Sequence, residues 1–113
     1  MKLAISIEVG SDLRAPICPA FGRAPRFLVH DTATNVTSIL VNDAAAGAHG
    51  AGTGAAALVV QSGAEAVVSG RFGPKAFEVL QAAGIEMYVT ATDGSAATAL
   101  ERFLAGDLRK AVP

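Results

Sequence analysis

The sequence predicts an α/β fold in which a mixed five-stranded sheet, in the order 3-2-1-4-5, packs against three helices. Residues 2–41 contain short apolar runs rich in β-branched residues, whereas the second half alternates such runs with alanine-rich helical segments. Glycine or proline stands at several of the junctions. A chain of 113 residues with this pattern is expected to form one domain, 1–113, around a modest core.

The first half predicts three strands. Apolar and polar residues alternate over 2–9, which indicates the first strand. The segment 10–25 contains three prolines and two glycines and is expected to be a loop. The runs 26–31 and 36–41 are joined by a short polar turn, so they predict a hairpin of the second and third strands.

The second half predicts helices that alternate with strands. Helices are expected at 52–61, 74–83 and 96–105, and strands at 64–69 and 85–89. Pro74 in the first turn and Gly84 beyond the last bound the second helix. Ser95 is the expected cap of the third helix and Gly106 its end. The tail 107–113 is expected to be frayed.

This order of elements brings several loops to one edge of the sheet. Right-handed crossovers make the fourth and fifth strands parallel to the first, so the carboxyl ends of the first, third, fourth and fifth strands meet. The loops 10–25, 42–52, 70–74 and 90–95 are expected along this edge, which we call the rim. Ligands of open α/β sheets bind where the strand order reverses, which here is between the first and fourth strands.

Glycines precede or open the two helices that begin at the rim: Gly50, Gly52 and Gly54 for the first, and Gly70 and Gly73 for the second. Glycine permits a positive φ and a close backbone approach to a ligand, and helix N-termini offer unpaired N–H groups. The alternative is that these glycines serve only tight turns. Neither set is followed by Lys-Ser/Thr, so a phosphate-binding nucleotide motif is not indicated. We expect Gly50, Gly52 and Gly73 to contact a ligand.

Two residues expected at the rim can ligate a metal. Cys18, the only cysteine, would be a soft thiolate ligand, and His49 an imidazole ligand. The alternatives are a small buried apolar residue and a loop histidine bonded to backbone. One thiol and one imidazole are too few for a closed structural metal site, but they suit a preformed cluster that brings its own ligands. His30 is expected to be structural.

Arg23 and Arg71 are the cations expected at the rim, for pairing with an anionic ligand or in surface salt bridges. Only Glu8 and Asp12 are expected near the site, which is too few carboxylates for a two-metal nuclease. No plausible Ser/His/Asp set is visible. We therefore expect that the protein is not an enzyme.

The composition of the chain argues against nucleic acid and membranes as partners. The net charge is −1, from 9 basic and 10 acidic residues, and a nucleic-acid binder usually has a basic excess. The apolar stretches are far too short to span a membrane. A lone cysteine, and a first segment in which Glu8 interrupts the apolar run, fit a cytoplasmic protein.

Several motifs resemble, in order, those of the dinitrogenase iron–molybdenum cofactor biosynthesis family. They are Phe-Gly-Arg-Ala at 21–24, Ala-His-Gly-Ala-Gly at 48–52, Gly-x-x-Gly-Pro-x-Ala-Phe at 70–77, Ala-Gly-Ile at 83–85 and Gly-Asp-Leu at 106–108. The resemblance implies a ribonuclease H-like fold without nuclease chemistry. It also implies a small carrier of iron–sulfur or iron–molybdenum clusters, or their precursors, in nitrogen fixation. The expected protein partners are a cofactor-assembly protein or a second copy of this chain.

The chain departs from the family pattern at two positions. Ala20 stands where many members have histidine, which removes one candidate ligand that Cys18 is placed to replace. Arg71 stands where many have asparagine, which favours an anionic ligand. The leading hypothesis is therefore a non-enzymatic binding or carrier protein for a metal cluster held by Cys18 and His49. The alternative is a regulatory module that binds a small anion or metabolite without metal.

Overall fold

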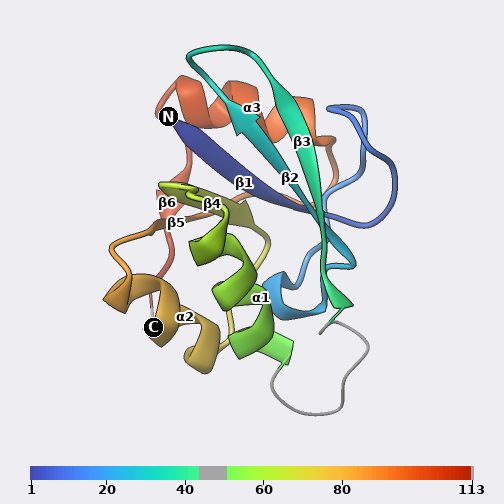
Figure 1. Cartoon of the computed structure of the whole chain (residues 1–113). Helices are drawn as coiled ribbons and strands as arrows, with labels where there is room; N and C mark the ends of the chain where they lie inside the picture. Colours follow the sequence, from blue (N-terminus) through green and yellow to red (C-terminus); the bar gives the residue numbers. More distant parts are fainter. Residues whose placement is uncertain (44–50, 113) are drawn as a thin grey trace.

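The computed structural model describes residues 1–43 and 51–112, which form a six-stranded mixed sheet with three α-helices (Figure 1). The sheet order is β3-β2-β1-β4-β5-β6. The strands are β1 Lys2–Ile7, β2 Arg26–Asp31, β3 Thr37–Val41, β4 Ala66–Ser69, β5 Glu86–Val89 and β6 Arg109–Lys110. The helices are α1 Ala51–Gln61, α2 Pro74–Ala82 and α3 Ala96–Leu104, with a short 3-10 turn, η1, at Phe21–Arg23.

The predicted α/β class, the three helices and the mixed sheet are confirmed, but the predicted number of strands is wrong. Gly106 adopts a positive φ of 76°, which turns the chain after α3 back along the sheet. Val89 then pairs with Arg109 in antiparallel register, and the Ala111 N–H donates to the Met87 carbonyl over 2.9 Å. The tail that was expected to be frayed is therefore the edge strand β6. The ribonuclease H-like assignment stays a prediction.

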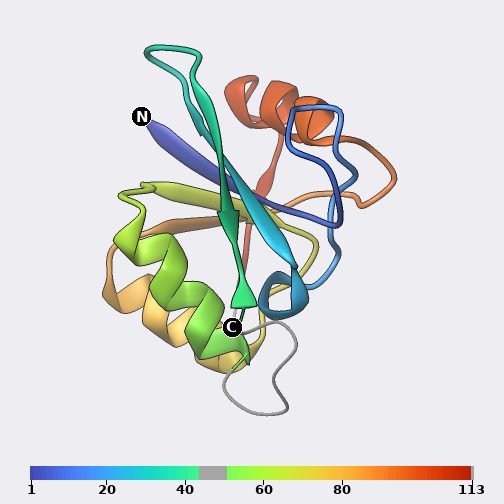
Figure 2. The same ribbon diagram turned by 45° about the vertical axis from the view of Figure 1, so that its right-hand side comes forward.

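Helices cover both faces of the sheet. Figure 2 shows α1 and α2 on one face and α3 on the other. The alternation of β1 explains this arrangement, because Leu3, Ile5 and Ile7 enter the core under α3 while Ala4 enters the core under α1 and α2. The parallel pairs β1–β4 and β4–β5 lie in the middle of the sheet, where both faces are buried.

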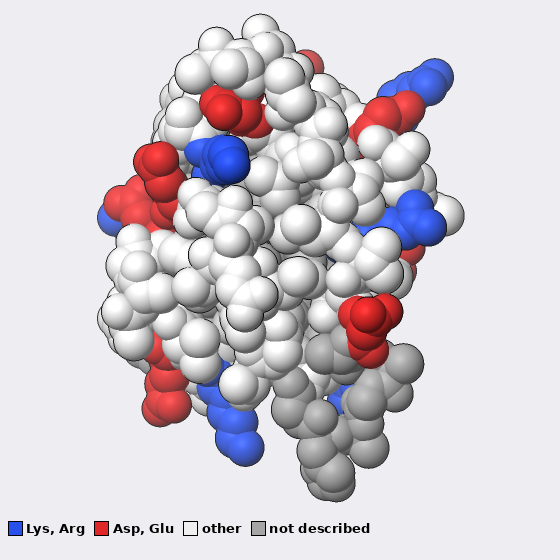
Figure 3. All heavy atoms as spheres, viewed as in Figure 1, with Lys and Arg blue, Asp and Glu red and all other residues white. Residues whose placement is uncertain are grey.

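The surface carries no dominant charge on the side seen in Figure 3. Acidic and basic side chains lie around the edge of this face, and its centre is uncharged. No helix of the described residues is long and apolar enough to cross a membrane.

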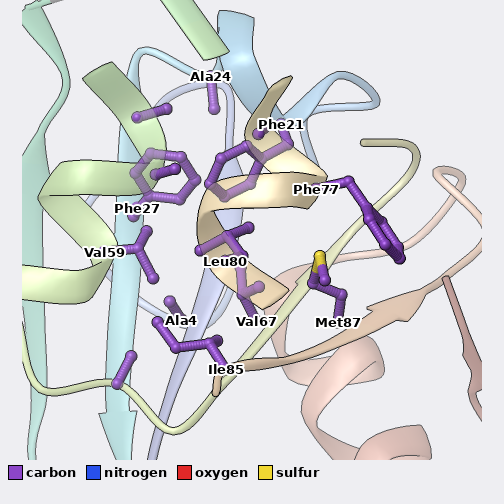
Figure 4. Close-up of a cluster of buried hydrophobic side chains, with 14 of the residues drawn as sticks. Ala4, Phe21, Ala24, Phe27, Val59, Val67, Phe77, Leu80, Ile85 and Met87 are labelled. Atoms are coloured by element: carbon purple, nitrogen blue, oxygen red, sulfur yellow. The ribbon is translucent and has the colours of Figure 1, made fainter. Parts of the chain in front are cut away.

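Aromatic residues fasten the long loop 10–25 to the core beneath α1 and α2. Phe21, in η1, is 1% exposed and lies beside Phe27 of β2, with 5.0 Å between ring centroids (Figure 4). On its other side Phe72, from the loop that follows β4, lies 5.2 Å away. A single buried ring therefore joins the loop before β2 to the loop before α2.

Removal of β6 should measurably destabilise the fold. We expect a chain truncated after Leu108 to lose about 1–2 kcal/mol of unfolding free energy, because it loses the strand pairing and the Ala111 hydrogen bond. Thermal unfolding should show this as a fall in Tm of roughly 4 °C or more. Truncation after Ala111 is the control, since Val112 is 81% exposed. Equal Tm values for the two truncated chains would contradict the assignment of β6.

Candidate functional site

The structure brings two of the predicted rim loops together at the carboxyl ends of β1 and β4. The Cys18 N–H donates to the Ser6 carbonyl over 2.9 Å, so the first loop returns along β1. The Phe21 N–H donates to the Arg71 carbonyl over 3.0 Å, and Ala20 forms an isolated parallel bridge with Arg71. The segments around Cys18 and Arg71, 53 positions apart in the numbering, are thus adjacent in the backbone of one rim.

Two buried serines hold these loops. The Ser6 hydroxyl lies 2.8 Å from the Cys18 carbonyl oxygen and 2.8 Å from the Ser69 hydroxyl, and both serines are fully buried. Because a hydroxyl has one proton and a carbonyl can only accept, Ser6 donates to Cys18 and accepts from Ser69. The network links the ends of β1 and β4 to the loop 10–25. The sequence predicts ligand binding at this position, between the first and fourth strands.

Cys18 lies at the rim, but it is buried. Its side chain belongs to the core under α1 and α2, the residue is 4% exposed, and the thiol donates weakly to the Ala20 carbonyl over 3.5 Å. Burial raises the pKa of this thiol above its usual range, and the negative charge of Glu8 adds to the rise while Arg71 opposes it. Cys18 is therefore protonated at neutral pH unless a bound metal displaces the proton.

Gly70 and Gly52 allow close backbone packing at the rim. A Cβ on Gly70 would lie 2.5 Å from the Pro19 carbonyl oxygen and 2.7 Å from the Thr92 methyl group. A Cβ on Gly22 would lie 3.0 Å from the Cα of Gly52, so η1 rests directly on the start of α1. None of the described rim glycines, Gly52, Gly54, Gly70 and Gly73, adopts a positive φ. Gly73, the N-cap of α2, faces open space.

The remaining predicted site residues fall into two groups. Arg23, in η1, and Arg71, directly after Gly70, both have exposed side chains. His49 and Gly50 lie outside the described residues, so their predicted place at the rim stays a prediction. Within 1–43 and 51–112, no three His, Cys, Asp or Glu side chains are grouped so that they could hold a metal ion.

A hollow of about 380 Å³ adjoins the Arg71 loop, and we call it the rim hollow. It is lined by Gly70, Arg71, Phe72, Val89, Arg109, Lys110, Ala111 and Val112. Three of these residues are basic and none is acidic, but Lys110 is paired with Tyr88, so its ammonium lies with Glu86 on the α3 side of the sheet. Lys110 forms one ion pair, at 3.4 Å with Glu86, and both side chains are largely exposed, so the pair holds the lysine only weakly.

Sequence reasoning missed Arg109 and Lys110 because it treated their segment as frayed. The usable signal was the sequence Gly-Asp-Leu-Arg-Lys after α3, in which a helix-ending glycine is followed by a return to apolar and then basic residues. The resulting arrangement can hold an anion through guanidinium and ammonium groups.

The chain matches the sequence model of a known family, the dinitrogenase iron–molybdenum cofactor family, over residues 1–106. It is 32% identical over 113 aligned positions to an uncharacterized protein of Methanocaldococcus jannaschii, and the match covers 97% of this chain and 91% of that protein.

Two solved structures share the fold and much of the sequence. The apo form of the orange protein from Desulfovibrio gigas is 38% identical, with a TM-score of 0.93 over 98% of this chain and 92% of that one. A putative NifB protein from Thermotoga, assigned to the DUF35 family, is 32% identical, with a TM-score of 0.84 over 96% of this chain and 91% of that one.

The close packing at Gly70 gives a paired test of the rim. Gly70→Ala should lower the unfolding free energy by about 1–3 kcal/mol, because the new methyl group collides with the Pro19 backbone. Gly73→Ala should cost less than about 1 kcal/mol, since nothing lies within 4 Å of its Cβ position and its φ is −72°. Urea unfolding measures both. Equal losses would mean that the two loops do not approach as described.

The raised pKa of Cys18 predicts a slow, pH-dependent thiol. At pH 7 iodoacetamide should alkylate the folded protein about tenfold or more slowly than the urea-unfolded chain, because both burial and protonation protect the sulfur. The folded rate should rise with pH until it passes the raised pKa. With one cysteine in the chain, mass spectrometry reads this rate without ambiguity. Equal folded and unfolded rates at pH 7 would contradict the burial of Cys18.

Proposed function

Because this chain belongs to the dinitrogenase iron–molybdenum cofactor family, we propose that it is a non-enzymatic carrier of a metal–sulfur cluster. The cargo is an iron–sulfur or iron–molybdenum cluster, or a precursor of one. The partners of such a carrier are cofactor-assembly proteins that load it and unload it, as in nitrogen fixation, and we place the protein in the cytoplasm.

The observation that carries this proposal is the cationic lining of the rim hollow. Arg71 and Arg109 line about 380 Å³ of space that no carboxylate lines, while the Lys110 ammonium pairs with Glu86. Metal–sulfur clusters with sulfide and thiolate ligands carry net negative charge, and arginine binds such anions through several N–H donors at once. Phe72 and Val89 add apolar surface that suits polarizable sulfur atoms.

Charge is expected to supply more of the affinity than direct ligation. Cys18 and His49 remain the candidate metal ligands; Cys18 lies beside the Arg71 loop but does not line the rim hollow. Its buried, protonated thiol must lose a proton to ligate, which lowers the gain from that bond. A carrier benefits from this balance, because contacts with cations release a cluster more readily than a complete set of thiolate ligands does.

Arg71 distinguishes this chain from many members of the family. It supplies charge where many members have asparagine, while Ala20 lacks the histidine that many members have at that position. Ala20 and Arg71 form a β-bridge with each other. The position that lacks the histidine and the position that gains the arginine are therefore neighbours at the rim. We infer that Arg71 compensates for the missing histidine by binding the cluster as an anion.

The same cations favour one alternative, a module that binds a small anion or metabolite without metal. Sulfate, phosphate or molybdate would meet the same guanidinium groups. The two proposals differ in whether iron is retained after reconstitution, and in whether Cys18 matters at all.

Anaerobic reconstitution with iron, sulfide and thiomolybdate tests the proposal. We expect the wild type to retain iron with absorbance near about 400 nm. Arg71→Gln should weaken retention about tenfold or more, because a charge-assisted contact is worth roughly 1.5–3 kcal/mol. Cys18→Ser should weaken it less. Binding should be tighter at low ionic strength.

The control is Arg14→Gln, since Arg14 is an arginine with a 92% exposed side chain that pairs with Asp12 outside the rim hollow. If the wild type retains no iron but binds molybdate, with a loss in Arg71→Gln, the alternative without metal is correct. If Arg14→Gln and Arg71→Gln lose equal amounts of iron, the rim hollow is not the site.

A further inference from the structure

A second hollow, of about 450 Å³, lies between the end of α3 and the strands β5 and β6. We call it the α3-side hollow. Its polar lining consists of Thr90, Arg102, Asp107 and Arg109, and Val89 and Leu108 contribute apolar surface. Leu108 packs into the core under α3, whereas Ala111, which lines the rim hollow, packs into the core under α1 and α2. The two hollows therefore lie on opposite sides of β6, and nothing in the proposed carrier function uses this one.

Thr90 carries an unsatisfied polar group at this position. The residue is 6% exposed, and its backbone N–H donates to the Ser69 carbonyl over 3.0 Å. Its hydroxyl is buried without a hydrogen-bond partner among the described residues. A buried hydroxyl that bonds to nothing destabilises the fold, and valine would fill the same space without that cost. A hydroxyl at this position is explained if it bonds to a ligand.

Two arginines line this hollow. Arg102 is half-buried in the last turn of α3, and Arg109 begins β6. In the described part of the chain neither forms an ion pair, although Asp107 lines the same space. Arg102 is the cation that lines this hollow alone, because Arg109 also lines the rim hollow.

We propose that the α3-side hollow binds a phosphate group, either as the free anion or as the monoester of a small organic molecule. Guanidinium groups match phosphate oxygens with two parallel N–H donors. The exposed Asp107 accepts a hydrogen bond from a protonated phosphate oxygen or from a ligand hydroxyl. Thr90 lines the hollow, and a rotation about χ1 would let its buried hydroxyl bond to the ligand.

Inorganic phosphate and phenyl phosphate, titrated into ¹⁵N-labelled protein and followed by NMR, test this site. We expect saturable shifts of the amides of Thr90, Ala91 and Leu108. Arg102→Gln should weaken binding about tenfold or more, and Thr90→Val about threefold or more. Without phosphate, Thr90→Val should raise the Tm by roughly 4 °C, because the unsatisfied hydroxyl is gone. Tighter binding of phenyl phosphate would identify a monoester, and equal binding the free anion.

Two controls separate this site from general charge effects and from the carrier site. Arg14→Gln removes the same charge at a distant exposed position, and Arg71→Gln removes a cation of the rim hollow only. Both should leave phosphate binding within about twofold of the wild type. The proposal is overturned if neither probe saturates, if Arg102→Gln binds as tightly as the wild type, or if binding is lost in Arg71→Gln instead. Because Thr90→Val keeps the shape of the side chain, it tests the site even if Arg102→Gln does not fold.

Discussion

The bonds of the Ser6 hydroxyl at the end of β1 hold the rim in place. This hydroxyl joins the Cys18 carbonyl to Ser69, and so connects two parallel strands to the loop 10–25. Each such buried hydrogen bond contributes about 1 kcal/mol net, but the loss of one partner leaves a buried polar atom unsatisfied, which costs more. Buried hydrogen bonds inside the sheet thus hold the rim loops, and these loops in turn position the exposed residues of the rim.

Small residues make this arrangement possible. Gly70 allows the Pro19 backbone to pass over the end of β4, and Gly22 and Gly52 allow η1 to rest on α1. Phe21 then fills the space between Phe27 and Phe72. Because these contacts involve backbone atoms, even one added methyl group forces a chain segment to move. The few large side chains of this core are concentrated where the loops meet.

The edge strand β6 decides where the charges lie. It places Arg109 beside both hollows and the Lys110 ammonium beside Glu86, although the chain as a whole has a net charge of −1. Both proposals, a cluster carrier at the rim hollow and a phosphate site on the α3 side, depend on this strand. Arg109 lines both hollows.

The sequence by itself determined most of the fold and part of the site. The alternation of 2–9, the hairpin over 26–41 and the bounded helices predicted the elements and the order of the first five strands, because hydrophobic periodicity and turn residues are local properties. The same rules placed Cys18 and Arg71 at one edge. They also led to the family, through motifs that are collinear along the chain.

Only the tertiary structure decided what depends on distant neighbours. The two-residue strand β6 is too short to show a pattern, and it exists because β5 offers a free edge and Gly106 turns the chain toward it. The burial of Cys18, which keeps its thiol protonated, comes from packing under α1 and α2 rather than from its flanking prolines. The unsatisfied hydroxyl of Thr90 likewise has no signal in the sequence, because a threonine at the end of a strand shows its lack of partners only when the surrounding chain is in place.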